Sequence, residues 1–443
     1  MQTIDTLINS RWVIPIEPDG QTLDFHSLAI HGGKIVEVLP TKDAGNKYHA
    51  TETVDLPHHA LIPGLVNAHT HAAMSLFRGL ADDLPLMDWL NNHIWPAEVK
   101  WVNEAFVRDG TELAVAEMLK SGTTCFSDMY FYPDVTAHAC IDAGMRACVG
   151  LIMLDFPSAW AQNADEYLHK GLKLHDELRN SELITTAFAP HAPYTVSDAP
   201  LEKICMYADE LDIPIHMHVH ETAHEVTEGQ KLHGVRPLAR LAKLGLLGPR
   251  LVAVHMTQLE ETEIKILAQD NVSVVHCPES NLKLASGFCP VQALVKAGVN
   301  VALGTDGAAS NNSLDMLEEM HIAALLAKGV SGDATAIPAR TALRLATLNG
   351  AKALGLEARI GSLTPGKAAD IAAIDLSAVS SQPVYDPVSQ IVYATTRNQV
   401  SDVWVNGKHL LAKYRLTGIN EEKLREKAIE WHGKISAADR KAR

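Results

Sequence analysis

The sequence predicts an α/β protein in which a (β/α)8 barrel of the TIM type is joined by a small β-sandwich domain built from both termini. Between residues 61 and 360, apolar stretches with strand character alternate with helical stretches, as in a parallel sheet. The segments before and after this region carry hairpin signals instead. Histidines and carboxylates gather where the predicted barrel strands end, which is where barrel enzymes place their reactive groups.

Residues 1–60 are expected to form the N-terminal part of the β domain, because short strand-like stretches there are separated by turn residues. A Gly32-Gly33 turn separates two of these stretches. The predicted strands are Thr6–Ile16, Leu23–His31, Lys34–Leu39 and Thr53–Leu56.

Residues 61–360 are expected to form the catalytic barrel, because eight apolar strands are the number that closes one. The strands are predicted at Leu61–His71, Thr123–Met129, Ala147–Leu154, Ile184–Pro190, Ile213–His218, Leu251–His255, Val272–Cys277 and Val299–Asp306. Helices are predicted at Asn103–Ser121, Ala199–Leu211, Glu260–Gln269 and Pro290–Ala297, with one further outer helix at Ile337–Leu354.

Residues 361–443 are expected to return to the β domain and to end in a charged helix. Asp370–Ile374 has strand character, and the Asn406-Gly407 pair between Val400–Val405 and Lys408–Ala412 is typical of a hairpin turn. Both termini therefore share a β character that the middle of the chain lacks, and one composite domain is the simplest arrangement.

Composition and charge restrict the partners that this chain can have. The 443 residues include 47% hydrophobic and 21% charged residues, which is typical of a soluble enzyme with a large core. Apolar runs are too short for a membrane span and the first residues do not resemble a secretion signal, so we expect a cytoplasmic protein. The net charge of −15 argues against nucleic acid as a partner, because phosphate binding uses clustered Lys and Arg.

A metal site is predicted from the histidines at the strand ends. His69 and His71 lie two apart at the end of one strand, so both imidazoles can face the same ion. The fifth strand ends in His216, His218 and His220, and alternation alone does not choose among them. Asp306 ends the eighth strand, and three imidazoles with one carboxylate are a common catalytic metal set. The fourth strand lacks a lysine that could bridge two ions, which favours a single metal.

Two residues next to these ligands are candidates for proton transfer and charge stabilisation. Glu221 follows the fifth strand, and a carboxylate beside a metal-activated water can accept a proton and pass it to a substrate. His255 ends the sixth strand and could polarise the same water.

These motifs resemble the amidohydrolase superfamily and, within it, the 5′-methylthioadenosine/S-adenosylhomocysteine deaminase family, which is related to s-triazine hydrolases. The motifs are Pro63-Gly64-Leu65-Val66-Asn67-Ala68-His69-Thr70-His71, His218-Val219-His220-Glu221 and Leu303-Gly304-Thr305-Asp306-Gly307-Ala308-Ala309-Ser310-Asn311-Asn312. The likeness covers essentially the whole chain. It implies one divalent metal, typically zinc, and an oligomer of two or more copies.

The resemblance also implies roles for individual residues. It assigns the metal to His69, His71, His218 and Asp306, which selects His218 on the fifth strand. It gives Glu221 the proton transfer to a ring nitrogen, His255 the assistance to water, and Asp306 a proton transfer to the departing ammonia. Glu98 matches the ribose-binding glutamate of the family and His191 its purine-contacting histidine. Ser310 is expected to be a further substrate contact.

The expected function is therefore hydrolytic deamination of an adenine nucleoside at C6. The resemblance implies that relatives that accept S-adenosylhomocysteine hold its carboxylate with arginines near the third strand, whereas Ala147–Leu178 contains no arginine. An unpartnered buried carboxylate is costly, so 5′-methylthioadenosine is the favoured substrate over S-adenosylhomocysteine or adenosine. Two alternatives stay open: a guanine or s-triazine deaminase or chlorohydrolase on the same site, and a barrel that has lost catalysis and serves as a structural subunit.

Overall fold

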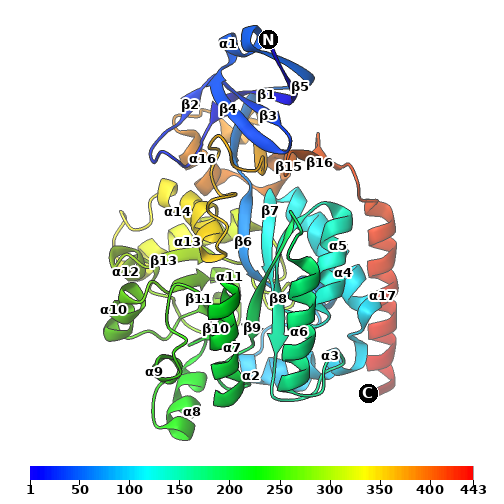
Figure 1. Ribbon diagram of the computed structural model, residues 1–443, viewed down its shortest axis with the longest axis vertical. Helices are drawn as coiled ribbons and strands as arrows, with labels where there is room; N and C mark the ends of the chain where they lie inside the picture. Colours follow the sequence, from blue (N-terminus) through cyan, green and yellow to red (C-terminus); the bar gives the residue numbers. More distant parts are fainter. Residues whose placement is uncertain (443) are drawn as a thin grey trace.

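The computed structural model describes the backbone of residues 1–442 and the side chains of residues 1–437. Eight parallel strands form a nearly closed barrel, and a mixed sheet of nine strands from both termini lies against one end of it. Figure 1 shows the terminal sheet at the top and the barrel with its surrounding helices below. This arrangement confirms the predicted fold class.

The barrel strands follow each other around the barrel in chain order, each parallel to the next. They are β6 (Leu65–Thr70), β7 (Thr123–Asp128), β8 (Arg146–Met153), β9 (Ile184–Pro190), β10 (Ile215–Val219), β11 (Leu251–His255), β12 (Ser273–His276) and β13 (Asn300–Leu303). The first and last strands meet just beyond β13, where the Asp306 amide donates to the His69 carbonyl at 3.0 Å. The carboxyl ends of all these strands therefore surround one space.

Helices cover the outside of the barrel (Figure 1). They are α4 (Glu104–Lys120), α5 (Pro133–Ala143), α6 (Ala164–Leu178), α7 (Asp198–Leu211), α8 (Ala223–His233), α9 (Pro237–Lys243), α10 (Glu261–Gln269), α11 (Pro278–Lys283), α12 (Val291–Lys296) and α13 (Met316–Ser331). Local sequence explains their ends: Asn103 caps α4 by accepting from the Phe106 amide at 3.0 Å, and Gly144 ends α5 in a left-handed conformation.

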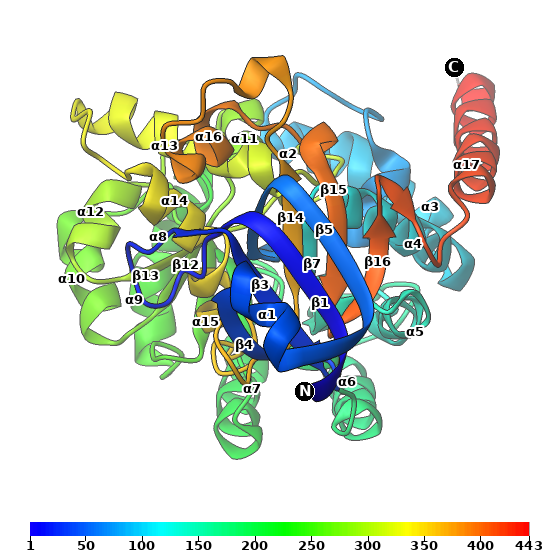
Figure 2. The same cartoon turned by 90° about the horizontal axis from the view of Figure 1, so that it is seen from above.

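The terminal sheet joins strands that lie far apart in the sequence. Its order is β17-β16-β15-β14-β5-β1-β3-β4, with β2 paired to β1. Its strands are β1 (Gln2–Val13), β2 (Leu23–Asp24), β3 (His26–His31), β4 (Lys34–Pro40), β5 (Tyr48–Pro63), β14 (Ile371–Asp375), β15 (Val400–Val405), β16 (Lys408–Ala412) and β17 (Arg415–Leu416). The two ends of the chain meet where β14 pairs antiparallel with β5, and Figure 2 shows these strands side by side.

The prediction of one strand at Leu61–His71 was wrong, because this stretch belongs to both sheets. The strand β5 ends at Pro63 in the terminal sheet, and β6 begins at Leu65 in the barrel. Gly64 lies at the junction, where a Cβ atom would come within 2.0 Å of Thr124 Oγ1. Only glycine allows the chain to pass so close to β7 as it enters the barrel.

The prediction of one outer helix at Ile337–Leu354 was also wrong. The structure has two helices there, α14 (Ala339–Leu345) and α15 (Leu348–Ala353), with non-helical Thr347 between them. The break turns α15 beneath the barrel, where a Cβ atom at Gly350 would lie 2.9 Å from the Val66 Cβ. The second helix therefore packs against the amino-terminal end of β6.

The remaining helices lie over the barrel mouth, in the terminal segments and along one edge. After β6 come the 3-10 helix η1 (Ala72–Phe77), α2 (Leu86–Trp89), the π-helix η2 (Leu90–Ile94) and α3 (Trp95–Trp101). The others are α1 (Thr41–Lys47), η3 (Val379–Ser381), α16 (Pro387–Ala394), η4 (Arg397–Gln399) and α17 (Glu421–Ala442). The predicted charged C-terminal helix is α17, which rests on α4 with Trp431 donating to Asp109 at 2.9 Å.

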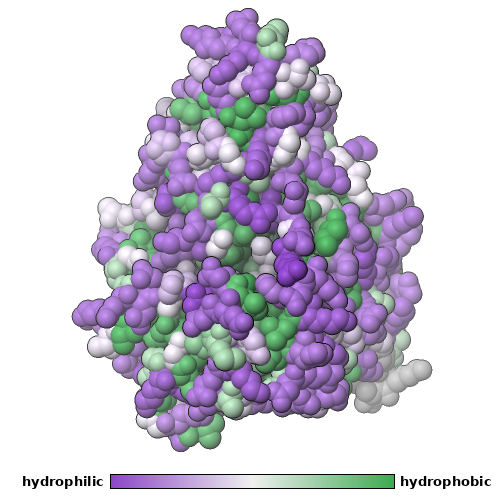
Figure 3. Space-filling model, in the orientation of Figure 1, coloured by the Kyte–Doolittle hydropathy of each residue, from purple (hydrophilic) through white to green (hydrophobic). Residues whose placement is uncertain are grey.

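The surface view in Figure 3 is mostly hydrophilic, with small separate hydrophobic patches. Over the part of the chain described, none of the helices combines the length and the apolar character that crossing a membrane would require. The division at residues 60/61 and 360/361 into three segments stays a prediction.

A buried ion pair between barrel and terminal sheet gives a testable prediction for stability. Arg146 on β8 donates to both carboxylate oxygens of Asp370 at 2.7 and 3.0 Å, and both side chains are only 2% exposed. Replacing Arg146→Met leaves a buried unpaired charge and should lower the free energy of unfolding by about 3–5 kcal/mol, measured by urea unfolding. The double variant Arg146→Met/Asp370→Asn should recover part of this loss.

The matched control for this prediction is an exposed pair on one helix. Lys265 and Glu261 are 70% and 84% exposed, so Lys265→Met should change the free energy of unfolding by less than about 1 kcal/mol. Equal losses for Arg146→Met and Lys265→Met would contradict the structural role of the buried pair.

Candidate metal centre and active site

Four side chains from three barrel strands converge at the barrel mouth. His69 lies on β6 and His71 directly follows this strand, His218 lies on β10, and Asp306 follows β13. Asp306 Oδ1 is 3.3 Å from His69 Nε2 and 3.1 Å from His71 Nε2, while His218 Nε2 is 3.2 Å from His69 Nε2. One potential ligand atom from each of these side chains lies within 4.8 Å of all the others.

The chemistry of these four groups fits a divalent cation. His71 Nδ1 donates to the Met129 carbonyl at 2.6 Å and His218 Nδ1 donates to the His191 carbonyl at 2.8 Å, because a carbonyl can only accept. In a neutral ring the Nε2 atom is then a bare acceptor. Burial opposes ionisation of Asp306, but its close contacts with His69 and His71 outweigh burial and hold its pKa well below the usual value, so Asp306 is a carboxylate. Acceptors that meet at close range need a cation between them.

The structure separates the three histidines of the fifth strand. His218 faces the other ligands, whereas His216 lies behind His69 with its Nε2 atom 2.9 Å from His69 Nδ1. His220 does not follow the alternation, because β10 ends at Val219 and His220 has φ +53°. Its ring turns away to accept from the Leu238 amide at 3.1 Å. Of the three histidines, only His218 faces the other proposed ligands, and it is also the residue that the family resemblance implies.

The Asp306 carboxylate is held by hydroxyl groups on its second oxygen. Ser280 donates to Oδ2 at 2.7 Å and Ser310 donates at 2.8 Å, while the Gly307 amide donates to Oδ1 at 2.8 Å. Ser310 thus orients a ligand, and its predicted contact with substrate stays a prediction. Ser280 was missed by the sequence analysis, although its position just beyond β12 was a signal.

Glu221 and His255 lie together beside the four convergent groups. His255 Nε2 is 3.9 Å from Glu221 Oε2, and His255 Nδ1 is 2.9 Å from Asn281 Oδ1. Glu225 holds the backbone at Glu221 by accepting from its amide at 2.7 Å. Burial, together with the negative charge of Asp306, raises the pKa of Glu221 to about 8, so its carboxyl group is protonated at neutral pH.

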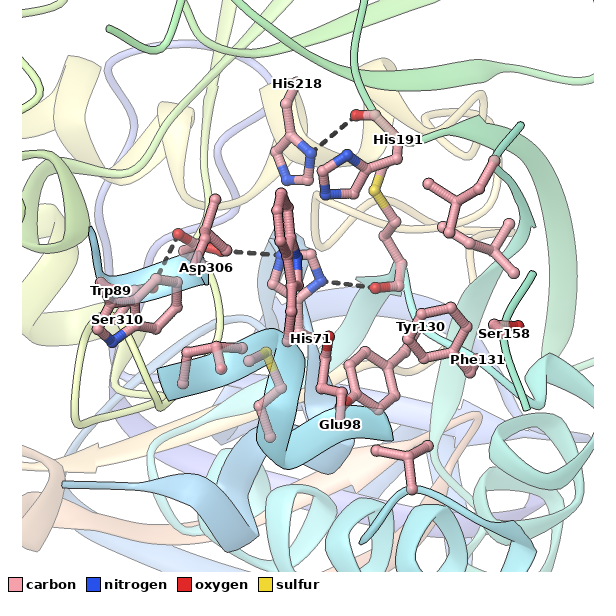
Figure 4. A pocket seen from close by; sticks show the side chains of 18 of the residues that line it. His71, Trp89, Glu98, Tyr130, Phe131, Ser158, His191, His218, Asp306 and Ser310 are labelled. Carbon is pink, nitrogen blue, oxygen red and sulfur yellow. Dashed lines mark hydrogen bonds and ion pairs between the residues drawn. The ribbon is translucent and has the colours of Figure 1, made fainter. Parts of the chain in front are cut away.

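A cavity of about 250 Å³ lies next to His71, His218 and Asp306, and Figure 4 shows side chains that line it. Glu98 from α3 lines it next to Tyr130, and burial raises the pKa of Glu98 to about 7. His191 lines it beside His218, with ring centroids 4.9 Å apart, and burial lowers its pKa to about 3, so the ring is neutral. Glu98 and His191 therefore add two polar groups to the cavity wall besides the four convergent side chains.

The rest of the cavity wall is largely apolar. Aromatic rings come from the segment over the barrel mouth and from beyond the ends of β7 and β8: Trp89, Trp95, Tyr130, Phe131 and Phe156. Within residues 1–437, neither lysine nor arginine lines this cavity. Apart from His69, which is buried beneath the surface, every predicted site residue does line it: His71, Glu98, His191, His218, Glu221, His255, Asp306 and Ser310.

Comparison with known proteins places the chain among the amidohydrolases. Residues 60–410 match the model of the amidohydrolase family. A 5-methylthioadenosine/S-adenosylhomocysteine deaminase of Saccharophagus degradans is 52% identical over 433 residues, which are 98% of this chain and 97% of that protein. One of Teredinibacter turnerae with the same name is 52% identical over 98% of both chains.

Solved structures show the same fold. An adenosine deaminase from Xanthomonas campestris with bound zinc has a TM-score of 0.98 and 54% sequence identity, covering 98% of this chain and 99% of that one. The atrazine chlorohydrolase TrzN of Arthrobacter aurescens, complexed with zinc, has a TM-score of 0.89 at 24% identity and covers 96% and 99% of the two chains. At this lower identity the likeness concerns the fold alone.

The contrast between His218 and His220 gives a testable prediction for metal binding. Replacing His218→Asn removes one of the four convergent ligand atoms and should abolish stoichiometric zinc binding, measured by elemental analysis after dialysis. His220→Asn changes a histidine two residues away that faces α9 and should keep about one zinc per chain. Full zinc content in the His218 variant would contradict the assignment.

Proposed function

This chain belongs to the amidohydrolase family, and on that premise we propose that it converts 5′-methylthioadenosine and water into 5′-methylthioinosine and ammonia. The chain is a hydrolase, and the relatives that it matches over nearly its whole length are deaminases by name. The observation that carries the proposal is the position of Glu221: a protonated carboxyl group lies beside the four convergent ligands and faces an apolar cavity.

The proposed cofactor is one zinc ion held by His69, His71, His218 and Asp306. The three imidazoles and one carboxylate suit zinc, and a related structure contains bound zinc. When bound, the ion supplies the Lewis acidity that lowers the pKa of water at the site to around neutrality. The remaining steps depend on side chains of the chain itself.

Glu221 is proposed to move the protons of the reaction. Because its pKa is raised to about 8, it can begin protonated and donate to a nitrogen of the adenine ring. Protonation makes C6 more electrophilic, so that water adds to C6. The double bond between C6 and the protonated ring nitrogen then becomes single. The resulting Glu221 carboxylate can then accept a proton from the attacking water, and the carboxyl group is restored.

His255 and Asp306 are proposed to complete the reaction. With Nδ1 facing Asn281 Oδ1, His255 keeps Nε2 as an acceptor toward the attacking water. Asp306, which is ionised, is proposed to accept the proton of the C6 hydroxyl group and pass it to the amino group, which then leaves as ammonia while the C6–O bond becomes the carbonyl of the product. Ser280 and Ser310 keep the carboxylate oriented during this exchange.

The polar and apolar parts of the cavity are proposed to recognise different parts of the nucleoside. Glu98 binds the ribose hydroxyls, His191 contacts the purine, and Ser310 contributes a further contact. The aromatic wall around Trp89 and Phe156 suits the small methylthio group, since sulfur packs well against rings. A carboxylate would find neither lysine nor arginine among the described cavity residues, which disfavours S-adenosylhomocysteine.

We also propose that the enzyme works in the cytoplasm as a dimer or larger homo-oligomer. All six cysteines are free thiols, as is usual for proteins of a reducing compartment. The oligomer is proposed from the family resemblance, and light scattering of the purified protein would test it.

Replacing Glu221→Gln tests the role in proton transfer. The amide has nearly the same shape but cannot exchange the proton, so kcat for methylthioadenosine should fall by at least about 100-fold. Zinc content, measured in parallel, should stay at the wild-type level because Glu221 is outside the ligand set. Substantial turnover by the zinc-loaded variant would refute the assigned role.

A substrate panel tests the proposed specificity. We expect kcat/KM, followed by ammonia release, to be at least about tenfold higher for methylthioadenosine than for S-adenosylhomocysteine, because burying the carboxylate without a partner costs more than 1.4 kcal/mol. Adenosine lacks the methylthio group and should be intermediate. Guanine and melamine serve as probes of the alternative ring specificities, and a preference for either would overturn the proposal.

A further inference from the structure

His69, His71 and His218 differ in the hydrogen-bond partner of Nδ1, the ring nitrogen that faces away from the candidate metal site. For His71 and His218 this nitrogen, Nδ1, faces a backbone carbonyl. For His69 it faces another side chain, the imidazole of His216, with 2.9 Å between His69 Nδ1 and His216 Nε2. A carbonyl always accepts, whereas a neutral imidazole nitrogen accepts or donates according to its tautomer. His69 is therefore the one histidine of this set whose proton position depends on a side chain.

The surroundings of His216 favour one of its two tautomers. The ring is 1% exposed, and its other nitrogen, Nδ1, lies 3.1 Å from the hydroxyl of Ser127 on β7. Its two contacts are an imidazole nitrogen and a hydroxyl group, so a neutral ring with one proton can satisfy both. A proton on Nδ1 can be donated to Ser127, which leaves Nε2 as an acceptor toward His69. Ser127 can in turn donate onward to the buried Cys148 thiol, whose pKa is raised to about 11 by burial.

The direction of the hydrogen bonds from His69 through His216 to Ser127 decides whether His69 can bind a cation. If His69 Nδ1 donates to His216, its Nε2 lone pair is free and points toward Asp306 and His218. If the chain runs in reverse, with Ser127 donating to His216 and His216 donating to His69, the proton of neutral His69 lies on Nε2. That proton would have to leave before a cation could bind.

We propose that His216 is a positioning residue that accepts from His69 Nδ1 and so keeps His69 Nε2 available as a metal ligand. The proposal rests on the metal centre described above but concerns a residue outside its ligand set. It explains why the fifth strand carries two inward-facing histidines: His218 contacts the site, and His216 supports the ligand from the first strand. Such supporting hydrogen bonds contribute to metal affinity because they set ring orientation and basicity.

The test compares His216→Leu with His216→Gln by competition of the apo-protein with a chelator for Zn²⁺ and Co²⁺. Leucine removes the acceptor, so affinity should fall by about 10–100-fold. The glutamine amide oxygen can replace Nε2 as acceptor, so His216→Gln should regain most of the affinity. The visible spectrum of the Co²⁺ protein should change in the leucine variant and return toward wild type in the glutamine variant. A wild-type affinity and spectrum in His216→Leu would overturn the proposal.

The matched control is His276→Leu, which removes a buried imidazole from another barrel strand, β12, and leaves the four proposed ligands unchanged. This ring is 1% exposed and its Nδ1 atom has no hydrogen-bond partner within the described chain, so metal affinity should stay within about threefold of wild type. An equal loss of affinity in both leucine variants would show a general effect of cavity formation and would also overturn the proposal.

Ser127→Ala keeps the proposal testable if His216→Leu does not fold. Loss of the hydroxyl leaves His216 in place but frees its Nδ1 atom, so metal affinity should fall by about threefold to tenfold. Unchanged affinity in Ser127→Ala would count against the hydrogen-bond chain. Failure of the wild-type protein to bind any divalent cation would instead refute the metal centre, so the two failures can be told apart.

Discussion

The structure depends on gathering three imidazole nitrogens and a carboxylate at one buried point. Such acceptors lose hydration and repel one another unless a cation lies between them, so this arrangement must be held by the surrounding fold. Strand β6 with the residue that follows it, strand β10 and the turn after β13 supply these four groups, and each group is oriented by a second contact. Two backbone carbonyls, His216 and two serine hydroxyls provide these contacts.

The barrel can hold these contacts because its first and last strands are fixed relative to each other. The Asp306 amide reaches the His69 carbonyl, and Asn67 on β6 accepts from the Thr305 amide through its side chain at 3.0 Å. At the opposite end, the terminal sheet continues directly into β6 through Gly64. The Arg146–Asp370 pair joins the same two sheets. The strand that carries His69 is therefore fixed at both of its ends.

The cavity beside the ligands combines two conditions that its proposed chemistry requires. Burial raises the pKa of Glu221, which makes a carboxyl group available as an acid near neutral pH. The apolar side chains of the wall favour a thioether tail over a charged one, because a charged group would lose its hydration there. The proposed proton transfer and the proposed substrate choice thus both depend on one buried, largely apolar cavity, and the segment from α2 to α3 supplies part of its wall.

The sequence by itself determined the barrel, the terminal β segments and the residues of the candidate site. Alternation of strands and helices is a local property, and the histidines marked the strand ends through their spacing. Tertiary structure decided what depends on contacts between distant residues. It divided Leu61–His71 between two sheets because of the close approach of Thr124 to Gly64, and it split Ile337–Leu354 so that α15 fits beneath the barrel. It also turned His220 away and placed His216 behind His69, because strand alternation ends with the strand and cannot show which ring lies behind another.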